Sequence, residues 1–118
     1  YIHSEAYAAG ELKHGTISLI EPGTLVVALA SYVKLFDKTM SNVKEVKARG
    51  ARVLGVALEG NRAIYSEADD VILVPRMDDL FVVPAEIVPL QLFAYYVAKA
   101  NGCAIDKPKN LAKSVTVE

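Results

Sequence analysis

The sequence has a single cysteine and no excess of charge of either sign. Cys103 cannot form an internal disulfide, which suits a reducing compartment and predicts a cytoplasmic protein. The 13 Lys and Arg residues nearly balance the 14 Asp and Glu residues, so there is no basic field to attract nucleic acid. No apolar run reaches the ~20 residues that span a bilayer, because Pro84, Glu86 and Pro89 interrupt the longest one. Neither nucleic acid nor a membrane is expected as a partner.

The N-terminus lacks the basic-then-apolar layout of a signal peptide, and the first residue is Tyr1 rather than Met. The chain of 118 residues is long enough for one domain at most. Its apolar fraction of 53% is high for a small domain, and it predicts either a sheet buried on both faces or a surface that covers a partner. We expect a fragment of a longer protein.

Three short apolar runs predict buried strands, and longer periodic segments between and around them predict helices. Strands that alternate with helices pair in parallel through right-handed crossovers, so the fold class is α/β with a partial three-layer α/β/α sandwich. A three-stranded sheet leaves an open edge for more chain or another subunit. The predicted strands are 24–31, 51–58 and 71–75, and the predicted helices are 1–15, 31–50 and 80–102.

The glycines match neither the dinucleotide-binding fingerprint nor the phosphate-binding P-loop. No cluster of His, Cys and Asp has metal-ligand spacing, and we expect neither a cofactor nor a metal. A flavodoxin-like cofactor domain is disfavoured, because no phosphate-cradling loop follows the first predicted strand. Cys103 has no histidine close in sequence and is interpreted as a packing residue.

Two residues carry candidate chemistry, each with a structural alternative. His14 ends "ELKH" before Gly15; it is either a cation favoured at a helix C-terminus or a general acid and base that titrates near neutrality. Lys113 lies in the tail "KNLAKSVTVE"; it is either a solvated terminal lysine or an amine that forms a Schiff base with a carbonyl substrate. Composition does not choose between these alternatives.

Two motifs favour the catalytic alternative for both residues. They are "EAYAAGELKHG" and "KPKNLAKSVTVE", separated by about 90 residues. Both resemble the end of proteins of the glucosamine-6-phosphate synthase family, the glutamine–fructose-6-phosphate amidotransferases. The resemblance runs through "VPLQLFAYYVA" to the last residue. It implies that residues 1–106 are most of the second sugar-isomerase (SIS) subdomain, with flavodoxin-like nucleotide-binding topology. It implies that residues 107–118 are a catalytic tail.

The resemblance also implies roles. Lys113 would form an imine with open-chain fructose 6-phosphate, and the backbone of Ala112 would line the sugar site. His14 would open the sugar ring from the neighbouring subunit, which makes the partner a second copy in a homodimer. The catalytic glutamate base would precede Tyr1, and the first SIS subdomain and the glutaminase domain would be supplied by the rest of the enzyme. The chain alone is therefore expected to be inactive.

The implied reaction converts fructose 6-phosphate and glutamine to glucosamine 6-phosphate and glutamate, within amino-sugar biosynthesis. An alternative of a different class is a non-catalytic SIS-type module that binds a sugar phosphate or serves as a dimerisation surface. The lysine-bearing tail discriminates between the two, because a sensor does not need a positioned amine.

Overall fold

The computed structural model describes residues 1–109. Ala112 and Lys113, the tail residues predicted to act at the sugar site, lie outside the described residues. The described elements are, in order, the 3-10 helices η1 (Ala9–His14) and η2 (Thr16–Leu19), β1 (Leu25–Leu29), η3 (Val33–Leu35), α1 (Phe36–Lys47), β2 (Arg52–Leu58), η4 (Ala63–Ser66), β3 (Asp70–Val74) and α2 (Asp79–Ala100).

The three strands form one parallel sheet in the order β1-β2-β3. Leu25 pairs with Arg52 at one end of the sheet, and Leu58 pairs with Val74 at the other. The apolar runs of the sequence therefore become parallel strands, and the predicted α/β class is confirmed. Each strand begins at the same edge, so the loops that follow the strands meet at the opposite edge.

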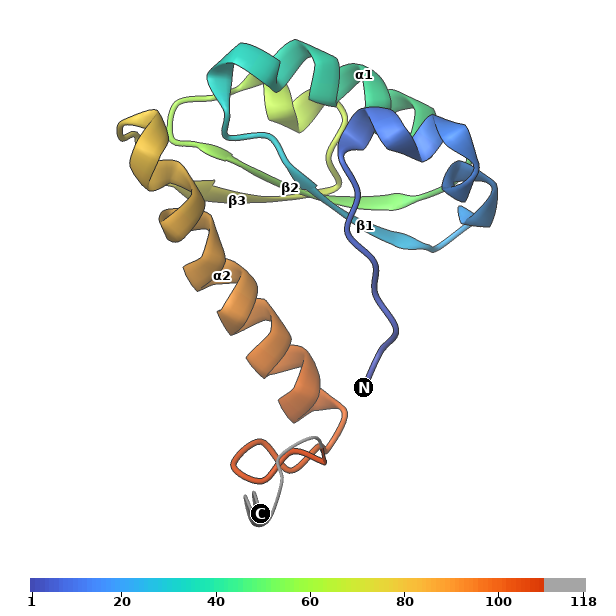
Figure 1. Cartoon of the computed structure of the whole chain (residues 1–118), viewed down its shortest axis with the longest axis vertical. Coiled ribbons are helices and arrows are strands. Elements are labelled where there is room, and N and C mark those ends of the chain that lie inside the picture. Colours follow the sequence, from blue (N-terminus) through green and yellow to red (C-terminus); the bar gives the residue numbers. More distant parts are fainter. Residues whose placement is uncertain (110–118) are drawn as a thin grey trace, which may run out of the picture.

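The upper face of the sheet is covered by α1, η1 and η4 (Figure 1). Helical periodicity in the sequence predicts one apolar face made of Val33, Phe36, Met40, Val43 and Val46. Met40, Val43 and Val46 are buried on the inner side of α1, and Phe36 is partly buried. Val33 is wrongly assigned to this face: it lies in η3 and is 65% exposed. Val43 and Val46 pack with Ala28 and Val53 of the sheet. This core gives α1 a rigid position above β1 and β2.

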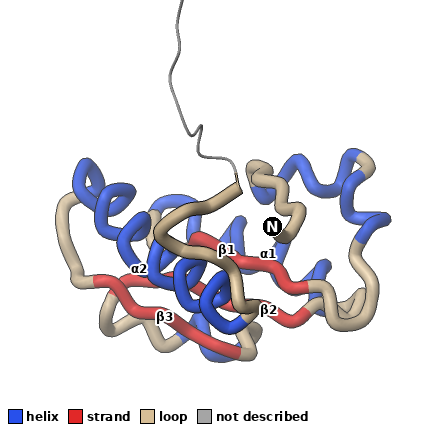
Figure 2. Tube along the Cα trace, turned by 90° about the horizontal axis from the view of Figure 1, so that it is seen from below, coloured by secondary structure: helices blue, strands red, loops and turns tan. Residues whose placement is uncertain are grey.

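The lower face is covered only in part, by the first half of α2 (Figures 1 and 2). Val82 of α2 is buried against Val56, Leu58 and Val74. Leu25 and Leu29 of the edge strand β1 each remain 47% exposed. The expectation of a sheet buried on both faces therefore holds for the central strand β2 and not for β1.

Helix α2 leaves the sheet and projects away from the domain (Figure 1). The radius of gyration is 16.4 Å, against about 13.5 Å for a compact domain of this size. The helix continues through Pro84 and Pro89 over 22 residues, and only 11% of its most apolar window is buried. By length and composition alone this helix could cross a membrane. The prolines and Glu86, which the sequence analysis treats as interruptions of the apolar run, lie within one continuous helix.

The predicted helix over residues 1–15 is wrong in its first half. Residues 1–8 have no helical structure, and the helix that follows is a 3-10 helix that begins at Ala9. Short helices depend on packing of an apolar face, and every side chain from Tyr1 to Ala8 is exposed. Without a buried face, the alanines of this segment do not suffice to form a helix.

Candidate catalytic segment around His14

His14 is the last residue of η1, and Gly15 ends the helix behind it. Gly15 has φ 146° and ψ −56°, a backbone conformation that side-chain-bearing residues rarely adopt. Lys13 and His14 occupy the last turn, as the helix-end signature of the sequence predicted. The segment "ELKHG" therefore ends in a sharp turn that presents His14 at the surface.

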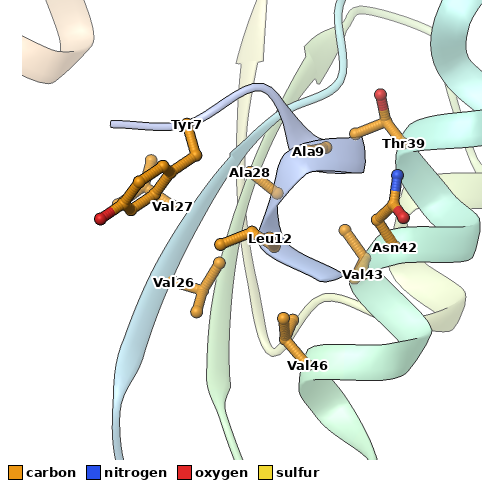
Figure 3. Close-up of a pocket in the computed structure, with 10 residues that line it drawn as sticks. All are labelled: Tyr7, Ala9, Leu12, Val26, Val27, Ala28, Thr39, Asn42, Val43 and Val46. Carbon is orange, nitrogen blue, oxygen red and sulfur yellow. The ribbon is translucent and has the colours of Figure 1, made fainter. Parts of the chain in front are cut away.

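Leu12 attaches η1 to the domain. It packs against the core formed by Ala28, Val43 and Val46. A small apolar cavity of about 70 Å³ remains beside it, and Figure 3 shows Leu12 in its wall, extending from η1 towards Val26 of β1. The full lining comprises Tyr7, Ala9, Leu12, Val26, Val27, Ala28, Thr39, Asn42, Val43 and Val46.

Lys13 forms a second attachment. Its Nζ lies 2.6 Å from Oε1 of Glu45 on α1. The two side chains are 47% and 36% exposed, so the pair is open to solvent. Two consecutive residues thus fix η1, one through apolar packing and one through an ion pair.

The His14 side chain is exposed. Within residues 1–109 it forms no hydrogen bond or ion pair, unlike His3, whose Nε2 lies 3.4 Å from Oε1 of Glu5. The ring is therefore available to a group outside the described chain. Both His14 alternatives of the sequence agree with this exposure.

Glu5 is a poor candidate for a catalytic base. Tyr7 donates a hydrogen bond to its carboxylate, and this bond is the main cause that lowers the pKa of Glu5. The hydrogen bond from His3 lowers this pKa further. The same bond raises the pKa of Tyr7. A carboxylate with a lowered pKa holds a proton less readily, so Glu5 does not replace the base that the resemblance places before Tyr1.

The predicted tail residues Lys113 and Ala112 lie outside the described residues, so their relation to His14 stays a prediction. The last described residue, Lys109, lies against the first: its backbone N–H donates to Oη of Tyr1. The Nζ of Lys109 lies 4.8 Å from the centroid of the Tyr1 ring. The two ends of the described chain therefore meet.

A larger cavity of about 350 Å³ lies at the edge where the strands end. Parallel α/β sheets commonly bind ligands at this edge. The cavity contains the buried Ser31, whose hydroxyl donates to the Val56 carbonyl at 3.3 Å, and the charged Asp37 and Arg76. His14 does not line it. Among residues 1–109 no group of three or more His, Cys, Asp and Glu residues could hold a metal ion.

Sequence reasoning missed two features, one beside His14 and one on α2. The Lys13–Glu45 pair joins residues far apart in sequence, and no local pattern signals it. Glu86, interpreted only as an interruption of an apolar run, is 7% exposed and lies on α2 four residues after Val82, which packs against the sheet. Its Oε1 is buried without a hydrogen-bond partner in the described chain.

Residues 1–100 match the SIS domain family. The whole chain is 55% identical to the glutamine–fructose-6-phosphate aminotransferase (isomerizing) of Clostridium tetani and 57% identical to that of Clostridium acetobutylicum. It is 52% identical to that of Thermus thermophilus. The alignments cover 100% of this chain and 19%, 19% and 20% of the respective relatives. The chain thus spans about a fifth of the length of the curated relatives it matches.

A solved structure is also similar, the C-terminal domain of glucosamine-fructose-6-phosphate aminotransferase from Francisella tularensis. The TM-score is 0.80 at 34% sequence identity. The match covers 91% of this chain and 30% of that one.

Proposed function

The chain belongs to the SIS domain family, and we propose that it is the last segment of the isomerase domain of a glutamine–fructose-6-phosphate aminotransferase. One observation carries this proposal: the identity of 52–57% to proteins of that name extends over all 118 residues. It therefore includes both the His14 segment and the tail that bears Lys113. In the longer enzyme, residues 1–106 belong to the second SIS subdomain and residues 107–118 form the catalytic tail.

Lys113 supplies the amine. Its neutral Nζ attacks the C2 carbonyl of open-chain fructose 6-phosphate, and loss of water gives an imine. Ammonia released from glutamine then replaces the lysine at C2, and a proton moves from C1 to C2 to give glucosamine 6-phosphate. The backbone of Ala112 lines the sugar. No metal or cofactor is needed for these steps, because imine formation and proton transfer are carried by side chains.

His14 opens the sugar ring. It takes the proton of the C2 hydroxyl and returns a proton to the ring oxygen. The bond between C2 and the ring oxygen then breaks, and the C2 hydroxyl becomes the carbonyl. Its exposure and its freedom from partners in residues 1–109 support action on a substrate held outside its own subdomain. We place that substrate in the neighbouring subunit of a homodimer in the cytoplasm.

The chain alone is expected to turn over no substrate. In this proposal the general base, the phosphate-binding loop of the first SIS subdomain and the glutaminase domain belong to the rest of the enzyme. Isomerase activity from the purified chain would contradict this part of the proposal.

A non-catalytic SIS module that binds a sugar phosphate or mediates dimerisation is the second candidate. A chimera decides between the two: this chain replaces the matching segment of the Clostridium tetani enzyme, and Lys113→Ala is introduced. The enzymatic proposal predicts that synthesis of glucosamine 6-phosphate is abolished while the protein stays folded by circular dichroism. Unchanged synthesis would favour the module. Lys107→Ala, in the same tail, is the matched control and is expected to keep activity.

A further inference from the structure

We propose that the Lys13–Glu45 ion pair fixes the orientation of the His14 side chain. Lys13 and Glu45 are then positioning residues for ring opening. The inference rests on the ring-opening role of His14 in the proposed function. It adds two residues to that step, one of them on α1, a helix to which the resemblance assigned no catalytic part.

The geometry of η1 carries the inference. A 3-10 helix has 3.0 residues per turn, so three consecutive side chains point in directions about 120° apart. Leu12 points inward to the core above β1, and Lys13 points to Glu45. The third direction, that of His14, is then away from both attachments. Fixing two of the three side chains fixes the rotation of the helix about its axis and therefore the direction of His14.

The helix has few other means of holding its orientation. It spans only six residues, none of them buried, and no side chain caps its N-terminus. The cavity of about 70 Å³ beside Leu12 shows that apolar packing alone does not fill the space under η1. A helix held only by Leu12 could rotate about that contact, and the ion pair opposes this rotation.

Glu45 is a suitable fixed point. It lies on α1, which is anchored by the buried Met40, Val43 and Val46. An ion pair as exposed as this one contributes little to global stability. Loss of the pair is therefore expected to change the position of His14 while the fold remains intact.

A substrate that needs no ring opening separates positioning from general damage. Fructose 6-phosphate closes its furanose ring through the C5 hydroxyl, and 5-deoxyfructose 6-phosphate lacks this group and stays open. In the chimeric enzyme, His14→Asn is expected to lower kcat/KM for fructose 6-phosphate by about 10²–10⁴-fold. It should leave kcat/KM for the 5-deoxy analogue unchanged.

The ion pair is then tested by Glu45→Lys, by Lys13→Glu and by the two together. Each single reversal is expected to lower kcat/KM for fructose 6-phosphate by about 10–100-fold, the effect of a misplaced catalytic group, and to spare the analogue. The double variant, which restores an ion pair in reverse, should recover most of the activity. Glu67→Lys is the matched control, because Glu67 pairs with Lys44 of the same helix at 3.8 Å and has no such link to η1.

The outcomes separate the inference from the proposed function. A selective loss in both single variants with recovery in the double variant supports the inference. Equal losses on both substrates, or no loss, in the Glu45→Lys enzyme would overturn it while leaving the role of His14 in place. Equal rates of the His14→Asn and parent enzymes on fructose 6-phosphate would overturn the ring-opening role itself, and the inference with it.

Discussion

Lys47 at the end of α1 and Asp69 before β3 are joined by an ion pair of 2.6 Å between Nζ and Oδ1. The second oxygen of the same carboxylate accepts a hydrogen bond of 2.7 Å from the backbone N–H of Val53 in β2. One side chain therefore links the covering helix to the start of two neighbouring strands. The hydrogen bond from Lys47 is the main cause that lowers the pKa of Asp69 below its ordinary value of 3.8, and the bond from Val53 lowers it further.

This arrangement predicts a pH dependence of stability. A lowered pKa in the folded state means that Asp69 stabilises the fold above its unfolded pKa, and that this contribution is lost as the pH falls below 3.8. Asp69→Asn should lower the free energy of unfolding at pH 7 and reduce the loss of stability between pH 7 and pH 3. Urea unfolding at both pH values measures this. The exposed Asp106→Asn serves as control, and an equal effect of both substitutions would contradict the prediction.

Gly55 of β2 is expected to resist substitution because of close packing. A Cβ at this position would lie 2.8 Å from Cγ1 of Ile64 and 3.1 Å from Cβ of Ala68. Gly55→Ala should lower the free energy of unfolding by about 1–3 kcal/mol, the cost of overpacking a filled core. Gly10→Ala is the control, because nothing lies within 4 Å of its added Cβ. A Gly55→Ala protein as stable as the parent would show that Ile64 moves freely, contrary to this account.

Glu86 is expected to lower the free energy of unfolding of the isolated chain. Its Oε1 is buried without a partner on the face of α2 that packs against the sheet, and a buried unsatisfied polar group costs about 1–3 kcal/mol. Glu86→Leu should raise the free energy of unfolding of the chain by an amount of this order. The exposed Glu59→Leu should not. A destabilised Glu86→Leu chain would mean that the carboxylate has a partner.

His14 is expected to matter for activity and not for the fold. The residue is exposed and has no hydrogen bond or ion pair in residues 1–109, so His14→Asn should leave the free energy of unfolding within about 0.5 kcal/mol of the parent. Leu12→Ala, which removes the apolar attachment of the same helix, should lower both stability and activity. Thermal unfolding and synthesis rates of the chimeric enzymes test the contrast. A large loss of stability in His14→Asn would assign the residue a structural role.

Much of the fold was predictable from the sequence because the strands are continuous apolar runs and α2 has clear limits. The helix predicted over 31–50 begins too early, since α1 starts at Phe36 after the separate 3-10 helix η3. The runs around Val26, Val56 and Ile72 became three parallel strands, as expected for buried strands joined by helices. Periodicity also identified Met40, Val43 and Val46 as core residues, but it wrongly added the exposed Val33, because the chain before Phe36 is not part of the α-helix. The N-terminal helix was predicted too early, since local composition does not reveal that residues 1–8 lack a surface to pack on.

The sequence predicted which residues of the candidate site carry chemistry, but not the contacts that hold them in place. The sequence identified His14 and Lys113 through a resemblance of motifs, and the structure describes the first of them. It did not reveal the Glu45 contact of Lys13 or the burial of Glu86, because both depend on how distant segments pack. The exposed apolar face of β1 was anticipated only as an open edge, without Leu25 and Leu29 being identified.

The central claim is that Lys113 forms an imine with fructose 6-phosphate, and trapping of that imine tests it most directly. The chimeric enzyme is treated with fructose 6-phosphate and borohydride, which reduces an imine to a stable amine, and is then digested and analysed by mass spectrometry. The account predicts a single sugar phosphate adduct on Lys113, absent from the Lys113→Ala protein. An adduct on another lysine, or none while synthesis proceeds, would contradict it.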